Sequence, residues 1–253
     1  MVFSKIVSSL EKCFIDESIE KFEVLKKASM LKNERFSFQI IYTSDENEIQ
    51  LMKFCKIKID AGALTPYVTV RTVEHVPATL PVYTPVPDDN FLRTTPGIYP
   101  DVLQPIHYHG CVTVIKDQLR GVWIDVDPQG AVEHGIYPIS ITMTDRNGNQ
   151  IADLSLELEI INASLPEQEL IFTQWFHCDA LANYYDCEVW SEKHWELIEN
   201  FARVAVKNGI NMLLTPVHTP PLDTAVGGER LTTQLVDVSL DNGLPLSAQK
   251  NWL

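Results

Sequence analysis

The sequence predicts an N-terminal antiparallel β-sandwich followed by an incomplete (β/α)8-barrel-like βαβ segment. First, residues 1 to about 165 hold many short β-type stretches separated by turn signals, without helical periodicity. Second, two later strand-like stretches each end in a His and an Asp with a helix-like segment between them, which is how a barrel builds its active face. Third, too few residues follow position 165 for the ~250 of a full barrel. We therefore predict a sandwich domain over 1–165 and a partial barrel over 166–253.

Composition limits the classes of function. The chain has 253 residues with 45% hydrophobic content, enough for a large core, and a net charge of −14. Such acidity disfavours binding to nucleic acid or to an anionic membrane surface. No apolar run approaches the ~20 residues of a membrane span, and the N-terminus does not resemble a secretion signal. Five cysteines without a C-x-x-C pair favour a cytoplasmic location over a disulfide framework.

Seven stretches of the first domain alternate in polarity or are rich in β-branched and aromatic residues, so we expect strands there. They are residues 35–42, 53–59, 67–73, 111–115, 121–126, 137–143 and 153–161. The last two should form a hairpin, because Asn147-Gly148 suits a type I′ turn. Seven prolines between Val76 and Pro105 predict a long ordered loop, which we expect to lie over the second domain.

The second domain should begin near residues 165–169 and contain a helix flanked by strands. Ser191 is a good N-cap for a helix over about 192–208, and Gly209 can take the left-handed position after it. Apolar residues at helical spacing should face the strands, namely Trp195, Ile198, Ala202 and Ala205. Strands are expected at 171–176, 210–214 and 231–238.

Several segments together resemble glycoside hydrolase family 123 and its uncharacterised relatives. In the C-terminal part these are Trp175–Asp179, Trp190–Trp195, Thr219–Asp223 and Glu229–Val236. In the N-terminal part they are Lys32–Gln39, Gly97–Leu103 and Leu119–Asp125. Each motif is weak by itself, but their order and number extend the resemblance over nearly the whole chain.

The resemblance implies a sandwich followed by a (β/α)8 barrel that acts on terminal β-linked N-acetylhexosamine, typically N-acetylgalactosamine, without a cofactor. It implies a retaining, substrate-assisted mechanism, an exception to the usual scheme with a carboxylate nucleophile. The acetamido oxygen of the sugar attacks C1, one carboxylate orients the amide, and an adjacent Glu is the general acid. That Asp-Glu pair belongs to a later barrel strand. The Asp-Glu dipeptides here, Asp16-Glu17 and Asp45-Glu46, lie in the N-terminal half and do not match it. We assign no catalytic residue and expect a truncated chain that is inactive alone.

Five residues are candidate sugar ligands. His177 and Asp179 follow the first predicted barrel strand, and His218 and Asp223 follow the second, where carbohydrate sites place fixed polar groups. Tyr185 is a candidate stacking residue, together with its aromatic neighbours. The alternatives are structural: the polar groups cap strand ends, Asp223 binds a nearby arginine, and the aromatic side chains pack against the sandwich.

Two further patterns carry no assignment. His107 and His109 would share one face of a strand, but without a third ligand nearby we predict no metal site. Cys178 has no evident base or oxyanion hole, so we do not assign it as a nucleophile.

Three functions stay open: a hydrolase, a non-catalytic carbohydrate-binding or assembly module, and a degenerate gene product. We also expect self-association, because an open barrel fragment exposes strand edges and apolar surface.

Overall fold

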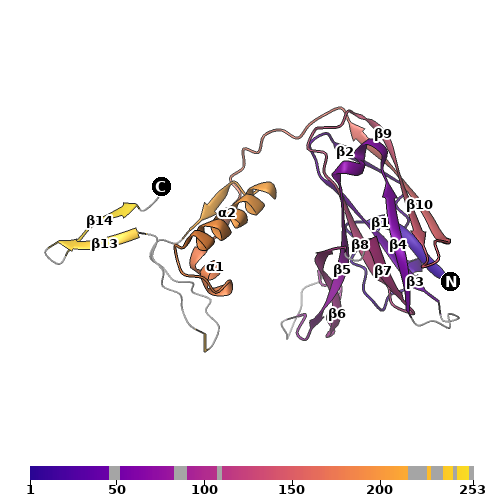
Figure 1. Ribbon diagram of the computed structural model, residues 1–253, viewed down its shortest axis with the longest axis horizontal. Coiled ribbons are helices and arrows are strands. Elements are labelled where there is room, and N and C mark those ends of the chain that lie inside the picture. The colour runs from indigo at the N-terminus through magenta and orange to yellow at the C-terminus, as the bar shows by residue number, and fades with distance from the viewer. Residues whose placement is uncertain are drawn as a thin grey trace. The chain divides into compact units, whose positions relative to one another are not determined.

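The computed structural model describes residues 1–45, 52–82, 90–106, 110–215, 227–228, 236–241 and 244–250 (Figure 1). The chain divides into two compact units, Met1–Leu165 and Pro166–Leu253. The first contains two packed β-sheets, and the second contains two helices and short strands.

The N-terminal unit is a sandwich of two five-stranded sheets. The first sheet has the order β1 (Val2–Ser8), β3 (Phe36–Ser44), β8 (Arg120–Val126), β5 (Val68–Ala78) and β6 (Gly97–Pro105). The second has the order β2 (Lys27–Leu31), β10 (Gln150–Ile161), β9 (Gly135–Thr144), β4 (Met52–Asp60) and β7 (Cys111–Ile115). The pairs within the sheets are antiparallel except β2–β10. The predicted β-rich class with antiparallel sheets is thus confirmed.

Alternation along the strands builds the main core between the sheets. Ile40 and Ile124 of the first sheet and Ile141 and Leu156 of the second are at most 1% exposed and belong to one apolar cluster. Each such side chain contributes ~1.5–3 kcal/mol through burial. A smaller cluster on the outer face of the first sheet contains Val7, Cys13, Ile19, Phe22, Ile41 and Leu119. It is covered by the segment that follows β1, which contains the short 3-10 helix η1 (Ile19–Lys21).

The prediction of one long loop from Val76 to Pro105 was wrong. β5 continues to Ala78, and β6 begins at Gly97 and pairs with it. Pro100 and Pro105 fit within β6 because this is an edge strand, where one side of the backbone needs no ladder donor. Of the described residues in this stretch, 79–82 and 90–96 lie between the two strands.

The predicted β9–β10 hairpin forms, but its turn is not type I′. Within this loop Gly148 has a positive φ of 84° and Asn147 does not, whereas type I′ needs both. The Asp145 carboxylate organises the loop by accepting hydrogen bonds from the backbone N–H groups of Asn147 (2.8 Å) and Asn149 (2.9 Å). An additional bond from the Asn149 side chain, 2.9 Å long, is the main cause of a lowered pKa at Asp145.

In the C-terminal unit two short strands are parallel, β11 (Thr173–Trp175) and β12 (Met212–Leu214). Between them in the chain lie α1 (Cys178–Tyr184) and α2 (Glu192–Lys207). A separate antiparallel hairpin consists of β13 (Val236–Asp241) and β14 (Leu244–Lys250). The strands predicted at 171–176 and 210–214 contain β11 and β12, which are shorter. The strand predicted at 231–238 overlaps β13 at residues 236–238, and its first five residues lie outside the described residues. The helix α1 was not predicted. The barrel-like architecture stays a prediction.

The predicted ends of α2 are close to those observed. The Ser191 hydroxyl accepts a hydrogen bond from the backbone N–H of His194, and Gly209 has a positive φ of 89°. Ile198, Ala202 and Ala205 are half-buried. Trp195 departs from the expected stripe, because it is 38% exposed.

Candidate functional site

Three of the five predicted sugar ligands surround α1. His177 is the N-cap residue without a capping side-chain bond, Asp179 lies in the first turn, and Tyr185 is the C-cap residue. His218 and Asp223 lie outside the described residues. The structure therefore brings His177, Asp179 and Tyr185 to one seven-residue helix that follows β11.

β11 leads into an aromatic surface at the start of α1. The ring of Trp175 stacks with that of His177 at a centroid distance of 6.2 Å and an interplanar angle of 15°. Trp175 is 68% exposed, so most of its ring surface remains open to solvent. A flat aromatic face beside a polar ring resembles the arrangement by which proteins hold one face of a sugar. Sequence analysis assigned no role to Trp175, although it begins the motif that contains His177.

Asp179 is buried, with 8% exposure, and no hydrogen bond to its carboxylate is present among the described residues. Its carboxylate oxygens therefore keep access to solvent, because the buried side-chain atoms without a partner in the described structure are those of His75. Its neighbour Cys178 has a raised pKa, first because of burial and then because of the charge of Asp179. The thiol therefore stays protonated, which argues against a nucleophilic role for Cys178.

His194, which sequence analysis did not assign, holds α1 and α2 together. It is 0% exposed. Its Nδ1 accepts a hydrogen bond from the backbone N–H of Trp190 (2.9 Å), and its Nε2 lies 2.8 Å from the carbonyl oxygen of Cys178. Because Nδ1 is an acceptor and the carbonyl cannot donate, the geometry requires the neutral tautomer with its proton on Nε2. The ring thus fixes the start of α1, where His177 and Asp179 lie.

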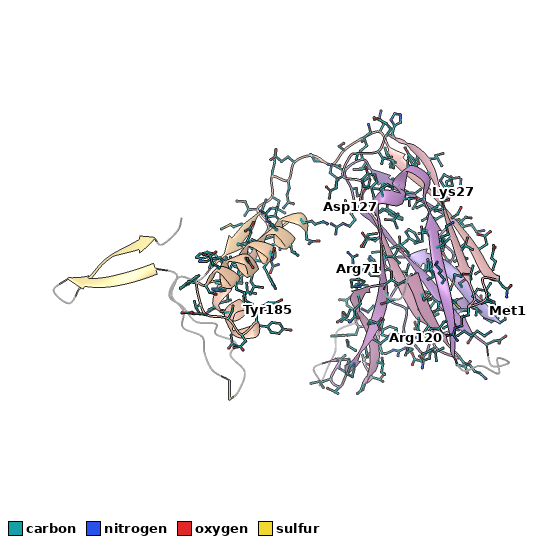
Figure 2. All side chains as sticks on the ribbon, in the orientation of Figure 1. Met1, Lys27, Arg71, Arg120, Asp127 and Tyr185 are labelled. Carbon is teal, nitrogen blue, oxygen red and sulfur yellow. The ribbon has the colours of Figure 1, made fainter. Side chains whose placement is uncertain are left out.

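Tyr185 belongs to an aromatic cluster at the other end of α1 (Figure 2). Its ring is in edge-to-face contact with Tyr184 (5.0 Å between centroids) and Phe201 (6.2 Å). Tyr185 is 39% exposed, whereas Tyr184 is 81% exposed. Tyr184 therefore offers more open ring surface than the residue that sequence analysis selected, and Tyr185 has a larger share of its surface in packing contacts.

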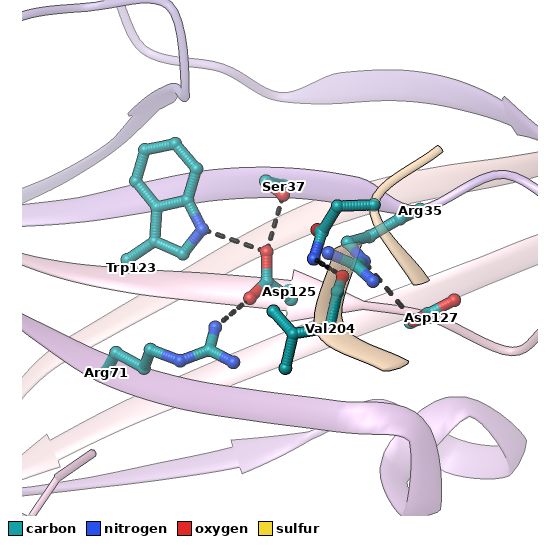
Figure 3. Close-up of polar contacts among 8 residues, drawn as sticks. Arg35, Ser37, Arg71, Trp123, Asp125, Asp127 and Val204 are labelled. Atoms are coloured by element: carbon teal, nitrogen blue, oxygen red, sulfur yellow. Dashed lines mark hydrogen bonds and ion pairs between the residues drawn. The ribbon is translucent and has the colours of Figure 1, made fainter. Parts of the chain in front are cut away.

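A second polar cluster, the Asp125 cluster, lies on the outer face of the first sheet of the sandwich (Figure 3). Asp125 is 7% exposed. Its Oδ1 accepts hydrogen bonds from the Ser37 hydroxyl (2.6 Å) and the Trp123 indole (2.9 Å), and its Oδ2 pairs with Arg71. Burial alone would raise the pKa of Asp125, but these three donors lower it below its ordinary value.

Both carboxylate oxygens of Asp125 are already bonded to neighbouring side chains, so we interpret the Asp125 cluster as stabilising the sheet and not as a binding site. Its members come from three adjacent strands: Ser37 from β3, Trp123 and Asp125 from β8, and Arg71 from β5. Alternation along β8 could have predicted this shared face from the sequence. Val122, Ile124 and Val126 face the core, so Trp123 and Asp125 lie on the other side of the sheet.

The N-terminal acidic dipeptides have structural partners. Asp16 forms an ion pair with Arg93 at 2.8 Å. Glu17 pairs with Lys21 at 2.6 Å and accepts a hydrogen bond from the backbone of Phe14. Asp45 binds the N-terminal amino group at 2.8 Å, and Glu46 lies outside the described residues. These contacts argue against a catalytic role for Asp16, Glu17 and Asp45.

Within the described parts of the chain, no group of three or more His, Cys, Asp or Glu side chains is placed to hold a metal ion. His107 and His109 fall outside those parts. None of the helices described is both long and apolar enough to span a membrane.

Comparison with known proteins adds independent findings. A model of the glycoside hydrolase 123 catalytic domain matches residues 175–245. A search of curated proteins found no match. A solved family 123 glycoside hydrolase from Clostridium perfringens, studied for glycolipid glycan hydrolysis, matches with a TM-score of 0.66 at 14% identity. The match covers 84% of this chain and 38% of that one, so this chain spans well under half the length of that enzyme.

Two other solved structures match only 64% of this chain each. A FixG-related protein from Vibrio parahaemolyticus has a TM-score of 0.27, 10% identity and 95% coverage of its own length. AggA, the major subunit of aggregative adherence fimbriae type I from Escherichia coli, has a TM-score of 0.30, 8% identity and 96% coverage. Such low TM-scores support no inference. By these comparisons the chain is similar to family 123 glycoside hydrolases, in sequence over residues 175–245 and in fold over 84% of its length.

Proposed function

We propose that this chain belongs to a retaining, substrate-assisted glycoside hydrolase of the β-N-acetylhexosaminidase type and contributes part of its glycan-binding surface. The observation that carries the proposal is the placement of Trp175, His177, Asp179 and Tyr185 around α1, inside the segment that matches the family 123 catalytic domain. His218 and Asp223 fall in the same matched segment and complete the proposed ligand set.

The proposed substrate is a glycan with a terminal β-linked N-acetylhexosamine. The Clostridium enzyme is described in terms of glycolipid glycan hydrolysis, which makes a glycolipid headgroup a reasonable source of such a sugar. In this chain the open face of Trp175 would stack on the sugar ring, and the carboxylate of Asp179 would accept hydrogen bonds from sugar hydroxyls.

The proposal assigns binding, not bond cleavage, to these residues. In the substrate-assisted mechanism the acetamido oxygen attacks C1 while a carboxylate orients the amide and an adjacent Glu protonates the leaving oxygen. Asp16, Glu17 and Asp45 already have structural partners, so no N-terminal dipeptide is a suitable source of that pair. We therefore expect this chain to be inactive alone.

The test combines turnover with binding. Wild-type chain should not hydrolyse 4-nitrophenyl N-acetyl-β-D-galactosaminide but should bind N-acetylgalactosamine in saturation-transfer NMR. Trp175→Ala should weaken binding by about tenfold, the value of one lost aromatic contact. The matched control is Phe54→Ala, which removes another half-exposed aromatic residue from the sandwich. Sustained turnover would contradict the binding-only role, and equal effects of the two variants would contradict the site.

A non-catalytic carbohydrate-binding or assembly module is the second candidate, favoured by exposed apolar surface in the C-terminal unit. Ile171 and Val206 are each 68% exposed, and Val204 is 61% exposed. Single exposed apolar residues are ordinary, but several in one small unit favour association. We therefore propose self-association. Light scattering that shows a monomer at high protein concentration would contradict it.

We also propose a cytoplasmic location. All five cysteines lie in the described residues and carry free thiols, which suits a reducing compartment. Recovery of the protein from the medium or from an oxidising compartment of the source cell would contradict this assignment.

A further inference from the structure

The exposed side of α1 links the two aromatic groups at its ends. Residues three, four and seven positions apart lie on the same side of a helix. His177, the N-cap residue, has this spacing with Ala180 and Tyr184. Ala180 and Tyr184 are exposed, whereas Cys178 and Ala182, on the opposite side, are buried. The solvent-facing side of α1 therefore carries an imidazole at its start and a phenol ring at its end.

This side of the helix is long enough for two linked sugar rings. Positions 177 and 184 are seven residues apart, which corresponds to about 10 Å along a helix. Ala180 lies between them, and its small methyl group leaves the surface low. Asn183 is also exposed, and no hydrogen bond of its side-chain amide is present within the described parts of the chain. That amide can therefore bind sugar hydroxyls.

Both ends of this side present an aromatic ring to solvent. At the start of α1 the ring of Trp175, which is 68% exposed, stacks with that of His177. At its end Tyr184 is 81% exposed, and its ring is in edge-to-face contact with Tyr185, which in turn contacts Phe201 of α2. These contacts restrict the Tyr184 ring before a ligand binds, which lowers the entropic cost of binding.

The chemistry of this side suits an uncharged sugar better than an ionic ligand. The chain has a net charge of −14, yet His177, Ala180, Asn183 and Tyr184 include no carboxylate and no ammonium group. Aromatic faces pack against the C–H groups of a sugar ring, while an amide and a phenol bind its hydroxyls. Rings at both ends with a small residue between them match a linear chain of sugars.

We propose that Tyr184 forms a second sugar-binding position and that an oligosaccharide lies along α1. Its terminal N-acetylhexosamine occupies Trp175 and His177, and an inner sugar stacks on the Tyr184 ring with its hydroxyls bound to Asn183. A terminal sugar is always linked to a next one, so the substrate of the proposed function supplies the inner sugar. This second position rests on the proposed function, which places the terminal sugar at Trp175.

The test compares three sugars on the full chain by saturation-transfer NMR titration: N-acetylgalactosamine, lactose, and a trisaccharide in which N-acetylgalactosamine is β-linked to lactose. The trisaccharide should bind about tenfold more tightly than N-acetylgalactosamine, because it adds one aromatic contact. Lactose should bind more weakly than the trisaccharide, because it lacks the terminal sugar. Equal affinities of the trisaccharide and N-acetylgalactosamine would overturn the proposal.

Matched variants locate the second position. Tyr184→Ala should lower the affinity for the trisaccharide to that for N-acetylgalactosamine and leave the affinity for the monosaccharide unchanged. Tyr184→Phe keeps the ring and should bind the trisaccharide nearly as wild type does. Ala180→Leu, which a helix tolerates, should obstruct the trisaccharide alone. Circular dichroism checks that each variant is folded.

The outcomes separate the second position from the proposed function. If a folded Tyr184→Ala variant binds the trisaccharide as wild type does, the second position is wrong, whatever Trp175→Ala does. If Tyr184→Ala weakens binding of the trisaccharide and Trp175→Ala affects neither sugar, the second position stands and the terminal site at Trp175 is wrong. If no sugar binds, both are wrong.

Discussion

Asp125→Ala should be among the more destabilising substitutions in the sandwich unit. The carboxylate accepts two hydrogen bonds and one ion pair, and a hydrogen bond to a charged group contributes ~1.5–3 kcal/mol. Arg71 is one-third exposed and regains water when its partner is removed, which reduces the cost. We expect a loss of about 3 kcal/mol, or about 1.5 M in urea midpoint for a domain of this size.

The assay is urea unfolding followed by the indole N–H signal of Trp123, the only tryptophan among residues 1–165. Asp125→Asn should lose about half as much, because its Oδ1 can still accept from Ser37 and Trp123. The lowered pKa of Asp125 also predicts how stability depends on pH. The carboxylate stabilises the fold fully above about pH 4, the pKa of Asp in the unfolded chain, and this stabilisation is lost as the pH falls through the lower pKa of the folded state. If Asp125→Ala lowers the free energy of unfolding by less than about 1 kcal/mol, the stabilising role of the Asp125 cluster is refuted.

Three further predictions concern buried groups. Both ring nitrogens of His75 are buried without a hydrogen-bond partner in the described structure, and burial lowers its pKa. Stability should therefore fall as pH drops below about 6.5, where only the unfolded chain takes up the proton, and His75→Leu should remove this dependence in urea titrations. His194→Ala should cost about 3 kcal/mol and speed hydrogen exchange in α1, whose first residue is Cys178; unchanged exchange would contradict its linking role. Burial is the main cause of raised pKa values at Cys13 (about 12) and Cys55 (about 11), so a thiol reagent at pH 8 should label them only on unfolding; fast native labelling would count against this.

Sequence periodicity predicted the strands that are buried on one face. β7 was predicted residue for residue at 111–115, and β10 was predicted within three residues because its leucines alternate along one side. β1 was missed because its apolar residues stand in two adjacent pairs, Val2-Phe3 and Ile6-Val7, and do not alternate. β2 was missed because Lys27–Leu31 has only five residues, without β-branched or aromatic side chains. β6 was hidden by its prolines, which an edge strand tolerates.

The candidate site was less predictable than the fold. His177 and Asp179 were selected because they follow a predicted strand. The helix α1 was not predicted, because its seven residues are too few to show helical periodicity. The role of His194 depends on two backbone groups, at Trp190 and Cys178, that come together only in the folded unit. Sequence patterns do not show such tertiary contacts to the backbone.

The parallel pairing of β2 with β10 also sets an order in time. Lys27 and Glu157, which are in contact in this pair, are separated by 130 residues in the chain. On a ribosome the first strands emerge long before the one that completes their sheet. Contacts so distant in sequence slow folding, typically to milliseconds or seconds. Until residue 161 is available, β2 lacks its partner strand and the nascent chain is most exposed to mispairing, which makes a chaperone most useful during that interval.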